Sequence, residues 1–137
     1  MTKLELGTKK HLTLDAARQI AGAAEAEAIK QGVRMSIAVV DDGGYLLTFL
    51  RMDGVAPAAA EVAFAKAKSA ALFGRSTKSW EEAAKDRTVV LKIPNVMPLG
   101  GGVPLIIDGQ RLGAIGASGS TSLKDDEVAQ AGAALLA

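Results

Sequence analysis

Residues 100–119 constrain the fold of this chain more than any other part of its sequence. Two apolar runs, 103–107 and 112–117, flank Asp108 and Gly109, a pair favoured in two-residue hairpin turns because both turn residues need φ > 0. The stretch therefore predicts a β-hairpin. Glycine weakens a strand, so the many glycines predict that a ligand, a helix or a second subunit approaches the backbone closely. These glycines are Gly100, Gly101, Gly102, Gly113, Gly116 and Gly119.

The first half of the chain predicts a helix followed by a second hairpin. Thr13 suits the N-cap of a helix over residues 14–31, and Gly32 suits the position just after its end. Residues 35–40 and 45–51 are apolar or alternating runs on either side of a polar, glycine-containing turn. They therefore predict two antiparallel strands.

Three further helices are expected. Pro57 suits the first position of a helix that Gly74 ends. Capping-box patterns at residues 79–82 and 122–125 open a short helix and a last helix that runs to the C-terminus. The expected buried residues are Ala58, Val62, Ala65, Ser69 and Leu72 in the second helix and Leu123, Val128, Ala131 and Leu135 in the last helix.

Hairpins imply antiparallel pairing, so the element order predicts an α+β fold rather than a parallel, doubly wound sheet. Residues 89–91 are a candidate additional strand, which Pro94 and Pro98 interrupt on its C-terminal side. With 137 residues and no linker or internal repeat, the chain is expected to form one domain over residues 1–137.

Composition excludes several classes of function. The net charge is +1, and the 16 basic residues are mixed with 15 acidic ones, so nucleic acid is not an expected partner. The absence of cysteine excludes disulfides and thiolate chemistry, and the single histidine, His11, excludes a multi-histidine metal site within one subunit; no metal site is expected. Residues 1–7 lack the apolar core of a signal peptide, so we expect a soluble, cytoplasmic protein with no membrane partner.

Several motifs together resemble one known family. They are Val40-Asp41-Asp42-Gly43-Gly44, Arg51-Met52-Asp53-Gly54, Lys66-Ala67, Gly101-Gly102-Val103-Pro104, Asp108-Gly109, Gly113-Ala114-Ile115-Gly116, Ser118-Gly119 and Asp126. In this order they resemble the GlcG/HbpS family, which includes the haem-binding C-terminal domain of PduO. The resemblance covers nearly the whole chain from Leu12 onward.

The resemblance implies a profilin-like or PAS-like core, in which a five-stranded antiparallel sheet carries helices on both faces, and a homo-oligomeric assembly. It also implies a small-molecule ligand, with haem as the candidate cofactor. Relatives often have His where this chain has Tyr45. Tyr can ligate haem iron, so Tyr45 and His11 are the candidate axial ligands. The family indicates the fold more firmly than the chemistry.

The leading hypothesis is a small-molecule-binding protein with a cleft for haem or another carboxylated ligand. Arg51 ends a predicted strand beside Asp53, where its guanidinium is placed either for a loop salt bridge or for a ligand carboxylate. The expected ligand-binding residues are Arg51, Asp53, Gly101, Gly102, Ser118 and Asp126. Asp126 is also a candidate partner of Arg51 or Lys66 across a subunit boundary.

The rival hypothesis is a cofactor-independent enzyme that acts on a small carboxylated metabolite by proton transfer. Lys66 or Glu61 would then be the base, and Arg51 would anchor the substrate. The two candidate bases lie about 140° apart around the helix, at 3.6 residues per turn. Whether the chain is catalytic is left open, as is a third reading as an assembly module without a ligand.

Overall fold

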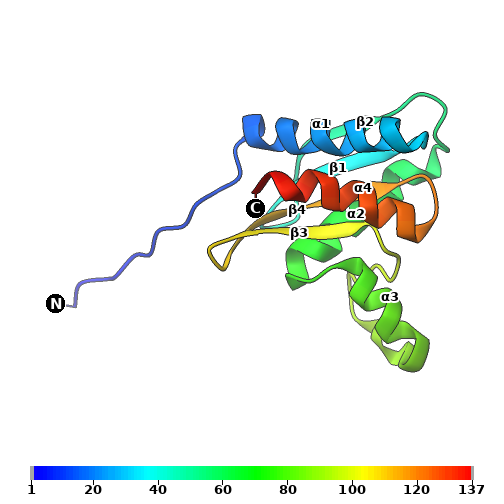
Figure 1. Cartoon of the computed structure of the whole chain (residues 1–137). Helices are drawn as coiled ribbons and strands as arrows, with labels where there is room; N and C mark the ends of the chain where they lie inside the picture. Colours follow the sequence, from blue (N-terminus) through cyan, green and yellow to red (C-terminus); the bar gives the residue numbers. More distant parts are fainter. Residues whose placement is uncertain (1, 137) are drawn as a thin grey trace.

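The computed structural model describes residues 2–136 and has helices on both faces of one antiparallel sheet (Figure 1). The order of the strands in the sheet is β2-β1-β4-β3. The strands are β1 (Ser36–Asp41), β2 (Leu46–Arg51), β3 (Gly102–Ile107) and β4 (Gln110–Ser118). The α+β class, the two hairpins and the helices on both faces are thus confirmed.

The expectation of five strands is wrong for the described part of the chain, where the sheet has four. The candidate strand at residues 89–91 lies instead in a short 3₁₀ helix, η1 (Thr88–Lys92). Val90 is its buried residue, whereas Val89 and Leu91 are 61% and 50% exposed. Pro94 and Pro98 follow closely and have no N–H to donate to a strand ladder, so this apolar run has little to hold it in a sheet.

Both hairpin turns have the backbone that their residues predicted. In the β3–β4 turn, Asp108 and Gly109 have φ values of 50° and 75°. In the β1–β2 turn, Asp41 Oδ1 accepts hydrogen bonds from the N–H groups of Gly43 and Tyr45 at 2.9 and 3.0 Å. The side chain of Asp41 therefore closes its own turn, as aspartate commonly does.

One face of the sheet is covered by α1 (Leu14–Gln31) and α4 (Ser122–Ala133). Thr13 caps α1 by accepting the N–H of Ala16, and Gly32 ends the helix with φ 70°, as expected. The predicted cap of α4 is wrong, because Thr121 rather than Ser122 is the cap. Its predicted buried face is confirmed at Val128 and wrong at Leu123 and Leu135, which are exposed. The residues that α4 buries are Asp125, Asp126, Val128, Ala129 and Gly132.

The opposite face is covered by α2 (Ala58–Phe73), which packs directly on glycines of the sheet. A Cβ on Gly116 would collide with Ala63 O, and a Cβ on Gly102 would collide with Lys66 O. Of the three causes considered for the glycines, close helix packing therefore holds at these two positions.

The predicted buried stripe of α2 is mostly wrong, because only Ser69 of its five members is buried. Alanines lie on every side of this helix, so its sequence shows little difference in hydrophobicity between one face and another. The buried residues are Ala59, Ala63, Lys66, Ala67, Ser69, Ala70 and Ala71.

The helix α3 (Thr77–Asp86) lies below the sheet with η1 (Figure 1). It begins earlier than expected because Ser76, not Ser79, is its N-cap. Trp80 of α3 packs edge-on against Phe73 of α2 with ring centroids 5.3 Å apart. This aromatic contact ties α3 to the end of α2.

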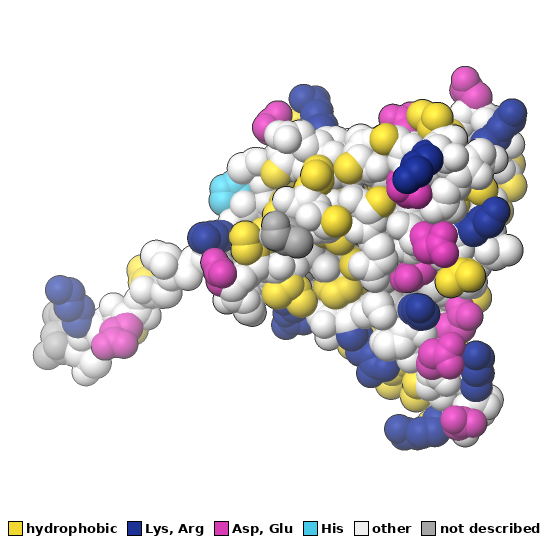
Figure 2. Space-filling model, in the orientation of Figure 1, with side chains coloured by type: hydrophobic (Ala, Val, Ile, Leu, Met, Phe, Trp, Pro, Cys, Tyr) yellow, Lys and Arg dark blue, Asp and Glu magenta, His cyan; other side chains and the backbone are white. Residues whose placement is uncertain are grey.

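Acidic and basic side chains are interspersed over the face that Figure 2 displays. Within residues 2–136, no helix combines the length and apolar character needed to cross a membrane. The predictions about nucleic acid and location in the cell stay predictions.

Candidate functional site

Two candidate residues, Arg51 and Ser118, lie in one row across an end of the sheet. Arg51 of β2 is paired with Ser36 of β1, and Ser36 is paired with Ser118 of β4. Residues directly opposite one another in a sheet point to the same face. In this row the shared face is the α2 side, because Ala38, two residues after Ser36, packs in the α2-side core.

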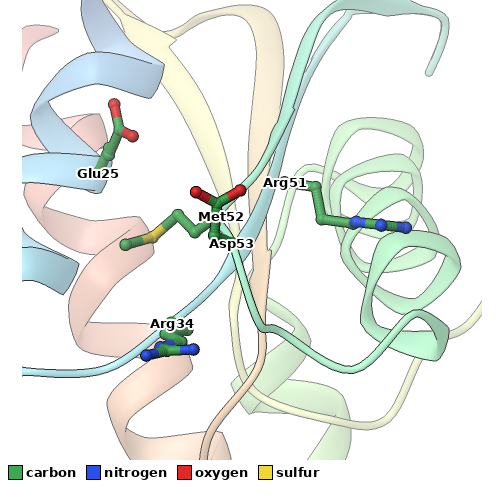
Figure 3. A pocket seen from close by; sticks show the side chains of 5 residues that line it. All are labelled: Glu25, Arg34, Arg51, Met52 and Asp53. Atoms are coloured by element: carbon green, nitrogen blue, oxygen red, sulfur yellow. The ribbon is translucent and has the colours of Figure 1, made fainter.

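A hollow of about 480 Å³ lies beside this end of the sheet. Its walls come from α1, the segment before β1, the end of β2 and the turn after it. In Figure 3 the Met52 side chain points toward the side of α1, and Arg34 lies below it in the view. The Arg51 side chain points in the opposite direction, toward α2. The lining residues are Glu25, Arg34, Arg51, Met52 and Asp53.

The two arginines that line this hollow keep their guanidinium donors available. In the part of the chain that the structure describes, neither Arg34 nor Arg51 has a carboxylate oxygen within 4.0 Å. Gly54, which has φ 83°, lies under the Arg34 guanidinium, and a Cβ at this position would collide with it. The glycine of the Arg-Met-Asp-Gly motif thus makes room for a basic side chain outside the motif.

Lys66 lies inside the protein rather than at the edge of a cleft. Its side chain is 2% exposed, and its Nζ donates to Asp125 Oδ2 at 2.9 Å and to Ala117 O at 3.0 Å. Asp125 Oδ1 accepts the N–H of Ser120 at 2.8 Å. The buried pair therefore joins α2, β4 and the start of α4. Within the chain Lys66 pairs with Asp125, and pairing of Asp126 across a subunit boundary stays a prediction.

The candidate enzyme residues have separate surroundings. Glu61 is exposed on α2, whereas Lys66 is buried and uses two of its three donors within the protein. Arg51 is exposed and lines the 480 Å³ hollow, which neither Lys66 nor Glu61 lines. The arrangement does not supply one place where a free base and an anchoring guanidinium meet, and the catalytic roles stay predictions.

The glycine loop before β3 directs backbone donors into the protein. Gly100 N–H donates to Glu81 Oε1 and Gly102 N–H donates to Thr77 Oγ1, both at 2.8 Å. A Cβ on Gly101 would lie 2.9 Å from Lys66 Nζ. Two helices thus occupy the space over this loop, and ligand contact by Gly101 and Gly102 stays a prediction.

Asp126 is 6% exposed, and its Oδ1 has no hydrogen-bond partner among the described residues. Burial raises the pKa of this carboxyl, and the charge of Lys78 acts in the opposite direction. Its place is on the α3 side of α4, since Lys78 and Glu81 are among the charged groups that act on it. Asp126 does not line the hollow beside Arg51.

The two candidate haem ligands lie outside the hollow. His11 is exposed just before α1, and Tyr45 is 75% exposed at the β1–β2 turn. The sequence reasoning also missed Arg34 and Glu25, which no motif marks. No motif marks the role of Asp125 either, since acidic residues in the first turn of a helix are expected to complement its dipole.

Comparison with known proteins identifies the family. Protein GlcG of Escherichia coli (strain K12) is 47% identical over 112 residues, which are 81% of this chain and 84% of that protein. A crystal structure of a double mutant of Streptomyces reticuli HbpS matches with a TM-score of 0.90 and 35% identity, covering 100% of this chain and 94% of that one. A PduOC:heme complex matches with a TM-score of 0.82 and 25% identity, covering 91% and 94% of the two chains.

The family model described as "Haem degrading protein HbpS-like" matches residues 12–134, nearly the whole chain. This match and the relatives confirm the resemblance that the sequence motifs indicated. The chain belongs to the HbpS-like family.

Proposed function

We propose that this protein binds a small molecule through carboxylate groups of that molecule, in the hollow beside Arg34 and Arg51. The observation that carries the proposal is that two arginines line one hollow of about 480 Å³, Arg34 on the side of α1 and Arg51 with its side chain directed toward α2. Within residues 2–136 neither has a carboxylate partner within 4.0 Å. A planar guanidinium binds a carboxylate through two parallel hydrogen bonds, which makes it a specific receptor for this group.

Haem is the first carboxylated ligand to test, since a relative is known as a heme complex and the family is described as haem degrading. The side chains that line the hollow can bind only part of a haem molecule. The Arg34 guanidinium suits a propionate, and Arg51 lines the same hollow with its side chain directed toward α2. The one sulfur that could bind iron, that of Met52, already accepts the Met35 N–H at 3.4 Å. His11 and Tyr45 lie elsewhere, so the hollow fits the carboxylates of haem and not its iron.

A hemin titration tests the proposal. We expect a saturable change in the Soret absorbance, with one hemin per chain. The Arg51→Lys variant keeps the positive charge but loses the two-pronged geometry, and Arg34→Ala loses both. Each should weaken binding about tenfold, the effect of losing one charge-assisted hydrogen bond. Arg87→Ala, an exposed arginine at the end of α3, is the matched control and should bind like the wild type.

If the hemin titration shows no binding, the same variants are tested with small mono- and dicarboxylates. The shift in melting temperature then measures binding. Stabilisation by one of these acids that both arginine variants lose would support the proposal with a ligand other than haem. No binding of hemin or of any carboxylate, or equal binding by all variants, would overturn it.

A further inference from the structure

Residues 2–8 extend away from the rest of the protein as an arm (Figure 1). All seven are exposed, and none belongs to a helix or strand. Two ion pairs hold the chain where the arm begins: Lys9 Nζ lies 2.6 Å from Asp42 Oδ2, and Lys10 Nζ lies 3.8 Å from Asp108 Oδ2. Because Asp42 and Asp108 belong to the β1–β2 and β3–β4 turns, the arm leaves the protein at the end of the sheet that carries both turns.

The arm has the alternating sequence of a β-strand. In an extended backbone Leu4 and Leu6 point to one side, and Lys3 and Glu5 point to the other. The two leucines are 83% and 89% exposed, so the rest of the chain leaves this apolar side uncovered. A strand also needs a neighbouring strand for its backbone hydrogen bonds. The pattern therefore indicates a strand without its partner.

Of the two edges of the sheet, β2 is the better one to accept a strand. Met52 N–H donates to Met35 O at 2.9 Å, and the pairs of an antiparallel ladder alternate between bonded and non-bonded. The N–H and C=O groups of Phe49 and Arg51 therefore point away from β1, toward the open edge. At the other edge of the sheet, β3 contains Pro104, which has no N–H to donate to an added strand.

The surface beside β2 carries apolar side chains that suit the leucines of the arm. Leu46 and Phe49 are paired with Val40 and Ala38, which pack in the α2-side core, so both face the α2 side of the sheet. They are 49% and 39% exposed. Leu72 near the end of α2 lies beside the β1–β2 turn and is 37% exposed. An apolar patch thus lies next to the open edge of β2.

We propose that the arm of one copy of this protein binds as an added strand along β2 of a second copy. Its leucines cover the apolar patch, and a shift of one residue would place Lys3 and Glu5 there instead, so the pattern sets the register. Seven arm residues at about 3.3 Å each span roughly 23 Å, and the six residues of β2 span roughly 20 Å. The occupant is a second copy because the arm is directed away from the sheet of its own chain (Figure 1).

Hydrogen exchange of the full chain tests whether the arm covers β2. Leu4→Glu/Leu6→Glu places charges on the apolar side of the arm, where both residues are exposed and outside the folded core. The amides of Phe49 and Arg51 should then exchange about tenfold faster than in the wild type, because they lose their hydrogen-bond acceptors. Lys3→Ser/Glu5→Ser changes the other side of the arm and should exchange like the wild type.

A cross-linking experiment shows which copy supplies the arm. The chain has no cysteine, so Glu5→Cys can carry a single benzophenone cross-linker on the arm. This protein and ¹⁵N-labelled wild type are unfolded in urea and refolded together. We expect links from the labelled arm to the ¹⁵N-labelled tryptic peptide 35–51, which contains β2. Links only within one chain or only to other peptides, or equal exchange at Phe49 and Arg51 in the wild type and Leu4→Glu/Leu6→Glu, would overturn the proposal.

Discussion

Asp126 is an acidic residue that is buried without a hydrogen-bond partner for one of its oxygens among the described residues. Its carboxyl is almost fully removed from solvent, yet one of its oxygens has no partner in the described chain. A carboxylate in this position must be desolvated without full compensation, so burial raises its pKa above the ordinary value of 3.8. The charge of this side chain therefore lowers the stability of the fold.

Asp126→Asn should raise the free energy of unfolding at about pH 7 and leave it nearly unchanged at about pH 3. Below the pKa of the unfolded chain the carboxyl is neutral in both states, so no charge is buried. As the pH rises through the pKa of Asp126 in the unfolded chain and then through its raised pKa in the folded protein, the folded state loses stability. The loss is complete above the pKa of the folded protein. Urea unfolding of both proteins at the two pH values measures this. An Asp126→Asn variant that is less stable than the wild type at neutral pH would contradict it.

At the scale of elements, the buried pair of Lys66 and Asp125 holds α2 and α4 together across the end of the sheet. The two side chains are 2% and 4% exposed, and their nitrogen and oxygen atoms lie 2.9 Å apart. The pair also satisfies the carbonyl of Ala117 and the N–H of Ser120. Each charge is therefore compensated where it lies, which is the condition under which a buried ion pair is tolerated.

Lys66→Met should destabilise the fold by roughly 3–5 kcal/mol, because it leaves Asp125 charged and buried without its partner. The double variant Lys66→Met/Asp125→Asn should recover much of this loss, since the charge is gone and the amide oxygen still accepts the Ser120 N–H. A double-mutant cycle in urea gives the coupling energy. Additive losses, with no recovery in the double variant, would show that the pair does not act as a unit.

At the scale of the whole molecule, the sequence predicted what depends on local backbone chemistry. The caps of α1, the glycines that end α1 and α2, and both hairpin turns follow from single residues whose conformations are restricted. The buried face of α2 could not be predicted, because alanines lie on several sides of it and the face is chosen by which glycines of the sheet it meets. The count of five strands came from the family resemblance, and the candidate strand at residues 89–91 lies in η1, whose apolar residues suit a strand as well.

The candidate site was predicted only in part for a similar reason. Arg51 and Asp53 were recognised because they end a strand beside a turn, and they line the hollow. Arg34 and Glu25 enter it from segments distant in sequence, and no local pattern marks them. The glycines were assigned to ligand binding, whereas the structure packs α2 against Gly102 and Gly116. A glycine shows that something comes close, and only the fold shows what.

The arrangement of helices also leaves one strand open, and this supports the expected homo-oligomer. On the α2 side of the sheet, α2 packs on β1, β3 and β4, and β2 is an edge strand. Phe49, which faces this side opposite Ala38, is 39% exposed, and Leu46 and Tyr45 are 49% and 75% exposed. An edge strand that carries exposed apolar side chains readily pairs with another chain.

We therefore predict that light scattering after gel filtration will give a multiple of the 14.0 kDa chain mass. Phe49→Lys places a charge on this edge, so the mass should fall toward that of one chain. Ile29→Lys removes an equally apolar side chain, 65% exposed on α1, and should leave the mass unchanged. A wild-type protein of 14.0 kDa would contradict the prediction outright. An assembly that Phe49→Lys leaves intact would instead place the contact away from β2, because a charged side chain at a buried edge is not tolerated without a partner.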